Sequence, residues 1–224
     1  CRLVNYPDAV KCLRCESILV ESGNANAGRS TKMRRLLVRA AICFCVCVAL
    51  IFGFYLSLIG TAKPLTLDEK DVVRSAIKVL KEKGFSTEAM LLSNFTVYRR
   101  TDNWLNASVA KENAFAATNF PFEIMTLYPD FFAYPADDTE RAAILLHEAR
   151  HLQGSDEKEA YEFVWKNRNK LGWTKEKYMN SHVWKNIRNQ TREYAPNLFV
   201  CDITEFYDCT ELTSQADTAE TGRG

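Results

Sequence analysis

The sequence predicts an α+β fold: a mainly helical domain with a small antiparallel sheet, preceded by one transmembrane helix and a short cysteine-rich segment. Three observations support this prediction. Residues 40–62 form a run of 23 positions without a charged side chain. After this run, apolar residues recur at the spacing of helices that bury one face. Only two stretches, 95–100 and 120–134, carry the β-branched and aromatic residues typical of strands.

Composition and charge narrow the class of protein. The chain has 224 residues, of which 47% are hydrophobic and 25% are charged, as in ordinary globular proteins. Its net charge is +1, so no basic field indicates a nucleic-acid partner. Residues 1–62 carry 8 Lys and Arg against 3 Asp and Glu, whereas residues 63–224 carry 21 against 25. The 8 cysteines fall into three groups that no single redox compartment explains, which indicates a chain that crosses a membrane.

Residues 1–20 are predicted to be a small zinc ribbon. Cys1 is followed after ten residues by Cys12 and Cys15, and two CxxC pairs around such a spacer hold zinc on two tight turns. The segment resembles the short zinc ribbons at the start of many prokaryotic membrane proteins, and this resemblance implies a fourth cysteine just before residue 1. Zinc would supply the folding energy of so small a unit. Two alternatives remain: the cysteines are unrelated reduced thiols, or Cys1 is the lipidated first residue of a bacterial lipoprotein.

Residues 40–62 are predicted to be a transmembrane helix, because an uncharged run of this length spans a hydrocarbon core. Residues 21–31 are small and polar and are expected to form a flexible linker, which continues to residue 39 as a basic flank. The basic residues of that flank are Lys32, Arg34, Arg35 and Arg39. The positive-inside rule therefore places the N-terminus in the cytoplasm and the residues after about 63 outside it. A signal peptide is the alternative, although its apolar region is shorter, about 7–15 residues.

Residues 63–212 are expected to form the outer domain. Thr66 and Glu69 make a capping box at the start of a helix that Gly84 ends. Residues 95–100 alternate like a strand.

The C-terminal part is predicted to be helical and then disordered. Residues 156–170 form one helix, and Thr174 caps another that runs to about residue 190. Cys201 and Cys209 are close enough in the sequence to form a disulfide in an oxidising compartment. Residues 213–224 are small and polar and are expected to be disordered.

The residues expected to do chemistry lie between these parts. His147, Glu148 and His151 form an HExxH motif in a chain that has only 3 histidines. Two histidines four residues apart on a helix point to the same side and can hold one Zn²⁺, and the glutamate between them lies beside the metal.

The motif lies on a predicted amphipathic helix. Asp137 or Asp138 is expected to cap this helix, and Gly154 to end it with a tight turn. An apolar stripe would face the core, so that the histidines face a cleft.

The motif resembles that of the zincin metallopeptidases, and the resemblance covers roughly residues 120–170. Zincins complete the zinc site with a third ligand, and two patterns point to Glu157. The segment HEARHLQGSDE is similar to the HExxHxxGxx turn of metzincins, although Glu157 stands where they have His or Asp. The segment from Glu157 to Tyr161 is similar to the glutamate helix of gluzincins, although Tyr161 stands where they have Asp or Asn. Glu159 and Glu162 remain alternatives.

The resemblance implies a metal-assisted hydrolysis. Zn²⁺ lowers the pKa of a bound water towards about 7, and Glu148 takes the proton as general base and passes it to the leaving amine. The oxyanion needs a further donor, for which the candidates are Tyr161, Tyr178 and His182. By the same resemblance, the strand within 120–134 is an edge strand that binds substrate in extended form. An ordinary core strand is the alternative.

The sequence therefore predicts a membrane-anchored zinc-dependent peptidase that acts on protein or peptide substrates outside the cytoplasm. A catalytic Zn²⁺ is expected on His147, His151 and Glu157. A structural Zn²⁺ is expected on Cys1, Cys12 and Cys15. Two interpretations compete with this one. In the first, HExxH lies on a helix whose polar face binds nothing. In the second, the chain is a non-catalytic, membrane-anchored binding or sensor module that keeps a zincin fold.

Overall fold

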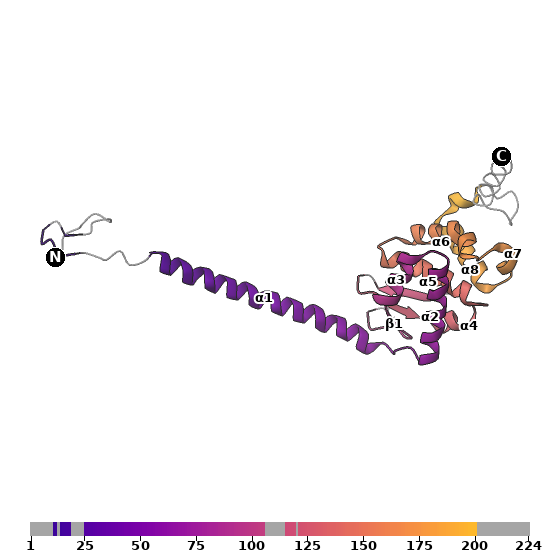
Figure 1. Ribbon diagram of the computed structural model, residues 1–224, viewed down its shortest axis with the longest axis horizontal. Helices are drawn as coiled ribbons and strands as arrows, with labels where there is room; N and C mark the ends of the chain where they lie inside the picture. The colour runs from indigo at the N-terminus through magenta and orange to yellow at the C-terminus, as the bar shows by residue number, and fades with distance from the viewer. Residues whose placement is uncertain (1–10, 13, 19–24, 106–114, 120, 201–224) are drawn as a thin grey trace. The chain divides into compact units, whose positions relative to one another are not determined.

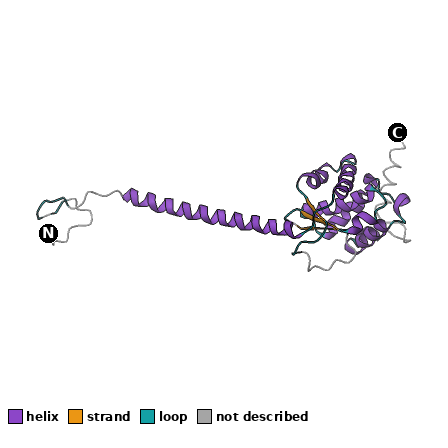
Figure 2. Ribbon diagram, turned by 90° about the horizontal axis from the view of Figure 1, so that it is seen from below, coloured by secondary structure: helices purple, strands orange, loops and turns teal. Residues whose placement is uncertain are grey.

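The computed structural model describes residues 11–12, 14–18, 25–105, 115–119 and 121–200. The chain divides into two units, residues 1–54 and residues 55–224. The described part is mostly helical, and a small sheet lies among the helices of the second unit (Figures 1 and 2). The elements in chain order are α1 (Ala25–Thr61), α2 (Leu67–Glu82), α3 (Ser86–Asn94), β1 (Val97–Arg99), β2 (Ala116–Asn119), β3 (Ile124–Leu127), α4 (Pro129–Ala133), α5 (Asp138–Leu152), α6 (Glu157–Leu171), α7 (Lys175–Tyr178), α8 (His182–Tyr194) and the 3-10 helix η1 (Pro196–Phe199).

The segment around Cys12 and Cys15 forms a tight turn. The Glu16 N–H donates to the Cys12 carbonyl at 2.9 Å, and the Cys12 N–H donates to the Ser17 carbonyl at 2.9 Å. Glu16 has a φ of 54°, a left-handed conformation that closes such turns. Cys12 is buried and Cys15 is exposed. Cys1 lies outside the described residues, so the zinc ribbon stays a prediction.

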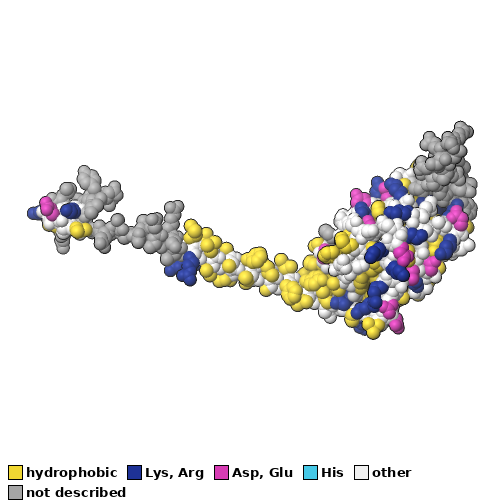
Figure 3. Space-filling view, viewed as in Figure 1, with side chains coloured by type: hydrophobic (Ala, Val, Ile, Leu, Met, Phe, Trp, Pro, Cys, Tyr) yellow, Lys and Arg dark blue, Asp and Glu magenta, His cyan; other side chains and the backbone are white. Residues whose placement is uncertain are grey.

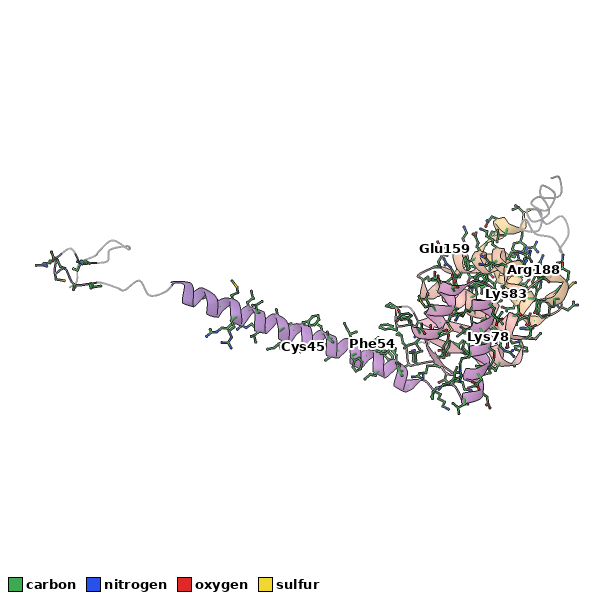
Figure 4. All side chains as sticks on the ribbon, viewed as in Figure 1. Cys45, Phe54, Lys78, Lys83, Glu159 and Arg188 are labelled. Carbon is green, nitrogen blue, oxygen red and sulfur yellow. The ribbon has the colours of Figure 1, made fainter. Side chains whose placement is uncertain are left out.

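α1 is a long apolar helix. It begins at Ala25, inside the segment expected to be a flexible linker, because residues 31–39 are mostly straight-chain side chains that favour a helix. From Lys32 to Thr61 it is long and apolar enough to cross a membrane. Hydrophobic side chains cover it and basic residues gather at one end (Figure 3). Cys45 and Phe54 project from it (Figure 4).

α5 lies at the centre of the second unit, where it packs against α2, α3, α6 and β2. Ten of its 15 side chains are buried, which is more than the single apolar stripe that the sequence predicted. α2 forms as expected: the Thr66 side chain accepts from the Glu69 N–H, and the Glu69 side chain accepts from the Thr66 N–H. Gly84, with a φ of +79°, follows the end of this helix.

The sheet is mixed, not antiparallel as the sequence predicted. Its strand order is β1-β3-β2, in which β1 pairs with β3 in parallel and β2 pairs with β3 antiparallel. All four residues of β3 are buried, as expected of a strand covered on both faces. β3 is therefore the central strand, so the expectation that residues 120–134 supply an edge strand is wrong. The strand is also short, because Pro129 begins α4.

The helix predicted from Thr174 to about residue 190 is divided into α7 and α8. Thr174 makes no capping hydrogen bond, whereas the Ser181 side chain accepts from the Trp184 N–H and caps α8. Serine is frequent at helix N-caps because its hydroxyl oxygen accepts a hydrogen bond from a backbone N–H of the first turn that would otherwise lack a partner. The predicted Cys201–Cys209 disulfide and the disordered tail lie outside the described residues.

Candidate metal centre

Local sequence signals fix both ends of α5. The Asp137 carboxylate accepts from the backbone N–H groups of Thr139 and Glu140, so Asp137 is the cap. At the other end, the Ser155 N–H donates to the Arg150 carbonyl at 3.0 Å, and the Gly154 N–H donates to the His151 carbonyl at 2.9 Å. This pair of bonds is a Schellman turn, which needs a left-handed residue, and Gly154 has a φ of +82°.

The turn leads directly into α6. The Asp156 side chain accepts from the Glu159 N–H and caps α6, so that Glu157 is its first residue. The unpaired N–H groups at the start of a helix favour negative charge. Because the connection is short, α6 begins beside the face of α5 that carries the histidines. The carboxylate of Glu157 lies at this start of α6.

His147, His151 and Glu157 converge there. Their ligand atoms all lie within 4.8 Å of one another, and they are the one such group found in the described ranges. The two histidine Nε2 atoms are 3.1 Å apart. Glu157 Oε2 is 3.4 Å from His147 Nε2, and Glu157 Oε1 is 3.5 Å from His151 Nε2. The side chains are 11%, 18% and 50% exposed in that order, so the group opens to solvent beside Glu157.

These distances fit a tetrahedral zinc site. Ligand atoms about 2.05 Å from a tetrahedral Zn²⁺ lie about 3.3 Å from one another, close to the three separations observed. Two imidazoles and one carboxylate are also a donor set that catalytic zinc sites use. The second nitrogen of His151, Nδ1, lies 2.9 Å from the Ser155 carbonyl, which fixes the proton on Nδ1 and leaves Nε2 as the ligand atom.

The group is strongly coupled electrostatically. Burial lowers the pKa of His151, but the hydrogen bond to Glu157 and the negative charge of Glu148 outweigh burial and raise that pKa to about 9. Hydrogen bonds from His147 and His151 hold the pKa of Glu157 far below its ordinary range. In the metal-free protein, the negative charge of Glu157 therefore holds a proton on His151 at neutral pH.

Glu148 faces the sheet beside this group. It is 5% exposed, and its Oε2 accepts a hydrogen bond of 2.7 Å from the Thr118 hydroxyl on β2. Thr118 was missed in the sequence, because a four-residue strand of Ala, Ala, Thr and Asn lacks the β-branched and aromatic composition that indicates strands.

Of the three candidates for the oxyanion donor, Tyr161 lies at the group. Its ring is 4.2 Å from the His147 ring and is stacked on Tyr194 at 5.4 Å. Burial, followed by the charges of Glu157 and Glu148, raises the pKa of Tyr161. The phenol therefore keeps its proton at neutral pH and can donate a hydrogen bond.

The other two candidates lie towards the start of α5. The Tyr178 hydroxyl donates to Asp137 at 2.7 Å, so the α5 cap already engages that donor. His182 follows Ser181, whose hydroxyl donates to Glu140, and Glu140 lies about 10 Å along α5 before His147. The contacts of His182 are with Phe115 and with Tyr134, on which it stacks at 4.5 Å.

The alternative third ligands stay outside the group. Glu162 accepts from Lys166 at 2.9 Å, one turn further along α6. Glu159 is exposed at the surface (Figure 4). Of the three glutamates considered, only Glu157 joins both histidines.

Comparisons with models of protein families, with curated proteins and with solved structures found no match.

Proposed function

We propose that the protein is a membrane-anchored, zinc-dependent peptidase. The observation that carries the proposal is the convergence of His147, His151 and Glu157, with Glu148 beside them and hydrogen-bonded to Thr118. A Zn²⁺ bound by the three ligands would activate a water and polarise a carbonyl group. A helix whose polar face binds nothing would not need a third charged group, from a different helix, aimed at both histidines.

Glu148 is the proposed general base. Its position between the two histidines in the sequence keeps it on the same side of α5, and it takes a proton from the attacking water and passes it to the leaving amine. A general base of this kind contributes about 10²–10⁴-fold to the rate. Tyr161 is the proposed donor to the oxyanion, since it is the one candidate in contact with a metal ligand.

β2 is the proposed binding strand for the substrate backbone. β3 occupies one side of β2, and no strand in the described ranges pairs with its other side. An extended peptide can add to such an edge through main-chain hydrogen bonds. Since Thr118 on β2 contacts Glu148, a peptide on this edge would run past the base. The proposed substrate is therefore an extended segment of a protein or peptide.

The proposed topology follows from α1. The basic residues on the N-terminal side of its apolar run, from Lys32 to Arg39, place that side in the cytoplasm by the positive-inside rule. The unit that carries the metal ligands then lies outside the cytoplasm. The Cys12–Cys15 turn would belong to a cytoplasmic zinc ribbon.

The full chain in detergent, supplied with Zn²⁺, tests the function. The wild type and Glu148→Gln are incubated with a library of proteome-derived peptides, and cleavage is read by mass spectrometry. We expect both proteins to bind one zinc ion at His147 and His151, and only the wild type to cleave. Equal cleavage by the two proteins would exclude Glu148 as the base. Zinc binding without cleavage by either protein would favour the non-catalytic binding or sensor module.

A further inference from the structure

The outer domain covers the last turns of α1. Leu56 is 49% exposed, whereas Leu58 and Ala62 are buried against the folded domain. On the face of α1 that carries Leu58 and Ala62, the surface that can meet lipid therefore ends before Leu58, short of the boundary at residue 62 that the sequence suggested. The exposed apolar stretch from Leu36 to Leu56 is still about 31 Å long, enough to cross a hydrocarbon core of about 30 Å. Arg39, near its start, can extend its charged end to the headgroups.

The segment after β1 runs back along this end of α1. Arg99 pairs with Pro64 in an antiparallel bridge. The Arg100 N–H then donates to the Lys63 carbonyl at 2.8 Å. Successive residues of the segment thus contact earlier and earlier positions of the chain, from Pro64 back towards the end of α1.

Trp104 is the end point of this run. Its backbone N–H donates to the Thr61 hydroxyl at 3.4 Å, and its indole N–H donates to the Ser57 hydroxyl at 3.2 Å. Ser57 and Thr61 lie about 6 Å apart along the helix axis, so the two bonds align the indole with the helix. The indole thus reaches the level of Ser57, one residue before the buried Leu58.

The tip of this segment is apolar and exposed. Trp104 is 50% exposed and Leu105 is 41% exposed. A buried side chain also fixes the conformation of the tip. Asn103 is fully buried, and its side-chain oxygen accepts a hydrogen bond of 3.0 Å from the Leu105 N–H. Two neighbouring large apolar side chains are thereby presented outwards on a braced turn.

We infer that Trp104 and Leu105 form a membrane-interface anchor, whose partner is the phospholipid bilayer that α1 crosses. The inference rests on the proposed membrane span of α1. Tryptophan favours the boundary between headgroups and hydrocarbon, because its ring is apolar and its N–H needs a polar partner, which Ser57 supplies here. The indole is bonded to Ser57, directly after the exposed Leu56, and this argues for lipid as the occupant of the tip. Lys63, exposed two residues after the end of α1, lies on the side of the headgroup phosphates.

The anchor gives the outer domain a second attachment to the membrane. A single helix allows a domain to tilt about the point where it leaves the bilayer. A second contact beside that point, from the segment that follows β1, restricts the tilt and fixes the height of the domain above the lipid.

Tryptophan fluorescence tests the anchor directly. The chain has 4 tryptophans, of which Trp165, Trp173 and Trp184 are at most 4% exposed. The full chain is placed in vesicles whose phospholipids are brominated either near the top of the acyl chain or near its middle. We expect emission to be quenched more by the shallow bromine than by the deep one. Trp104→Phe, which keeps an apolar ring, should lose this quenching and keep its zinc and its far-ultraviolet dichroism.

In a matched control, the exposed tryptophan is moved from position 104 to position 179. Met179 follows α7 directly and is 38% exposed, and Figure 1 shows α7 on the other side of the domain from the end of α1. Met179→Trp in the Trp104→Phe background should emit without quenching. Three results would overturn the anchor: quenching in this double variant equal to that of the wild type, equal quenching before and after Trp104→Phe, or stronger quenching by the deep bromine.

Extraction with alkaline carbonate distinguishes a failure of the proposed membrane span from a failure of the anchor. A chain that alkaline carbonate removes from the vesicles overturns both the span of α1 and the anchor that rests on it. A chain that resists extraction, but whose tryptophans are not quenched, overturns the anchor alone.

Discussion

The Thr118 hydroxyl donates a hydrogen bond of 2.7 Å to the Glu148 carboxylate, and this bond joins the edge strand β2 to the helix that carries both histidines. Glu148 is almost fully buried, and a buried carboxylate is costly without donors. The Thr118 hydroxyl supplies such a donor and orients the carboxylate. Thr118 is therefore a positioning residue for the proposed base.

Replacement of Thr118 should weaken catalysis without loss of metal. Thr118→Val keeps the shape of the side chain and removes the donor, so we expect kcat to fall about 10-fold, equivalent to a hydrogen bond to a charged group of about 1.5 kcal/mol. Thr118→Ser keeps a hydroxyl and should restore most of the rate. An unchanged kcat in Thr118→Val would remove Thr118 from the mechanism.

Zinc affinity should identify Glu157 as the third ligand. Loss of an outer partner of a metal ligand costs about 10–100-fold in affinity, so loss of a direct ligand in Glu157→Ala should exceed about 100-fold. Glu159→Ala is the matched control, because Glu159 lies on the same helix with an exposed side chain. Competition with a fluorescent chelator measures both values. Equal affinities of the two variants would contradict the assignment.

Zinc binding should release a proton from the metal centre. The pKa of His151 is raised from 6.5 to about 9 in the metal-free protein, so His151 carries a proton at neutral pH that the metal must displace. Apparent zinc affinity should therefore rise with pH and level off above about 9. Calorimetry at pH 7 in buffers of different ionisation enthalpy should show a release of about one proton. A heat of binding that is independent of the buffer would contradict this expectation.

Asp137 should make the domain sensitive to acid. Burial raises the pKa of Asp137, but hydrogen bonds from Lys177, Tyr178 and the Glu140 N–H outweigh burial and leave it below 3.8. A carboxylate with a lowered pKa stabilises the fold above its unfolded pKa, and this contribution is lost as the pH falls through the folded value. Asp137→Ala should cost about 1 kcal/mol at pH 7, with a difference that shrinks as the pH falls below the unfolded pKa of about 3.9 and through the folded pKa.

Thermal unfolding followed by circular dichroism measures this difference. Asp138→Ala is the control, because the neighbouring carboxylate makes only a partly exposed pair with Arg141 at 3.1 Å. Such a pair contributes roughly 0.5 kcal/mol. A cost for Asp137→Ala that does not shrink as the pH falls from about 4 to about 2 would show that its charge is not involved.

The convergence of the three proposed metal ligands could be predicted from the sequence because it depends on local signals. His147 and His151 share one face of a helix, and Gly154 and Asp156 set the turn that returns Glu157 to them. Each signal acts within a few residues, so spacing and capping rules apply directly.

The surroundings of the base could not be predicted in the same way. Thr118 reaches Glu148 across 30 positions of sequence, from a strand without strand-like composition. The central place of β3 likewise depends on pairing with β1 and β2, which no local pattern encodes. The division between α7 and α8 follows from the bond between Ser181 and Glu140, which forms only when the chain is folded.

The short turn between α5 and α6 also bears on how the protein is made. All three metal ligands lie within 11 consecutive positions, so their convergence closes only a small loop. Contacts of this kind form early, whereas the pairing that brings β2 to α5 is long-range and slow. A newly made chain can therefore capture its ion on a two-helix hairpin while the base still lacks its strand. Under the proposed function, metal uptake would precede the onset of proteolysis, and this order would protect the chain from its own activity during synthesis.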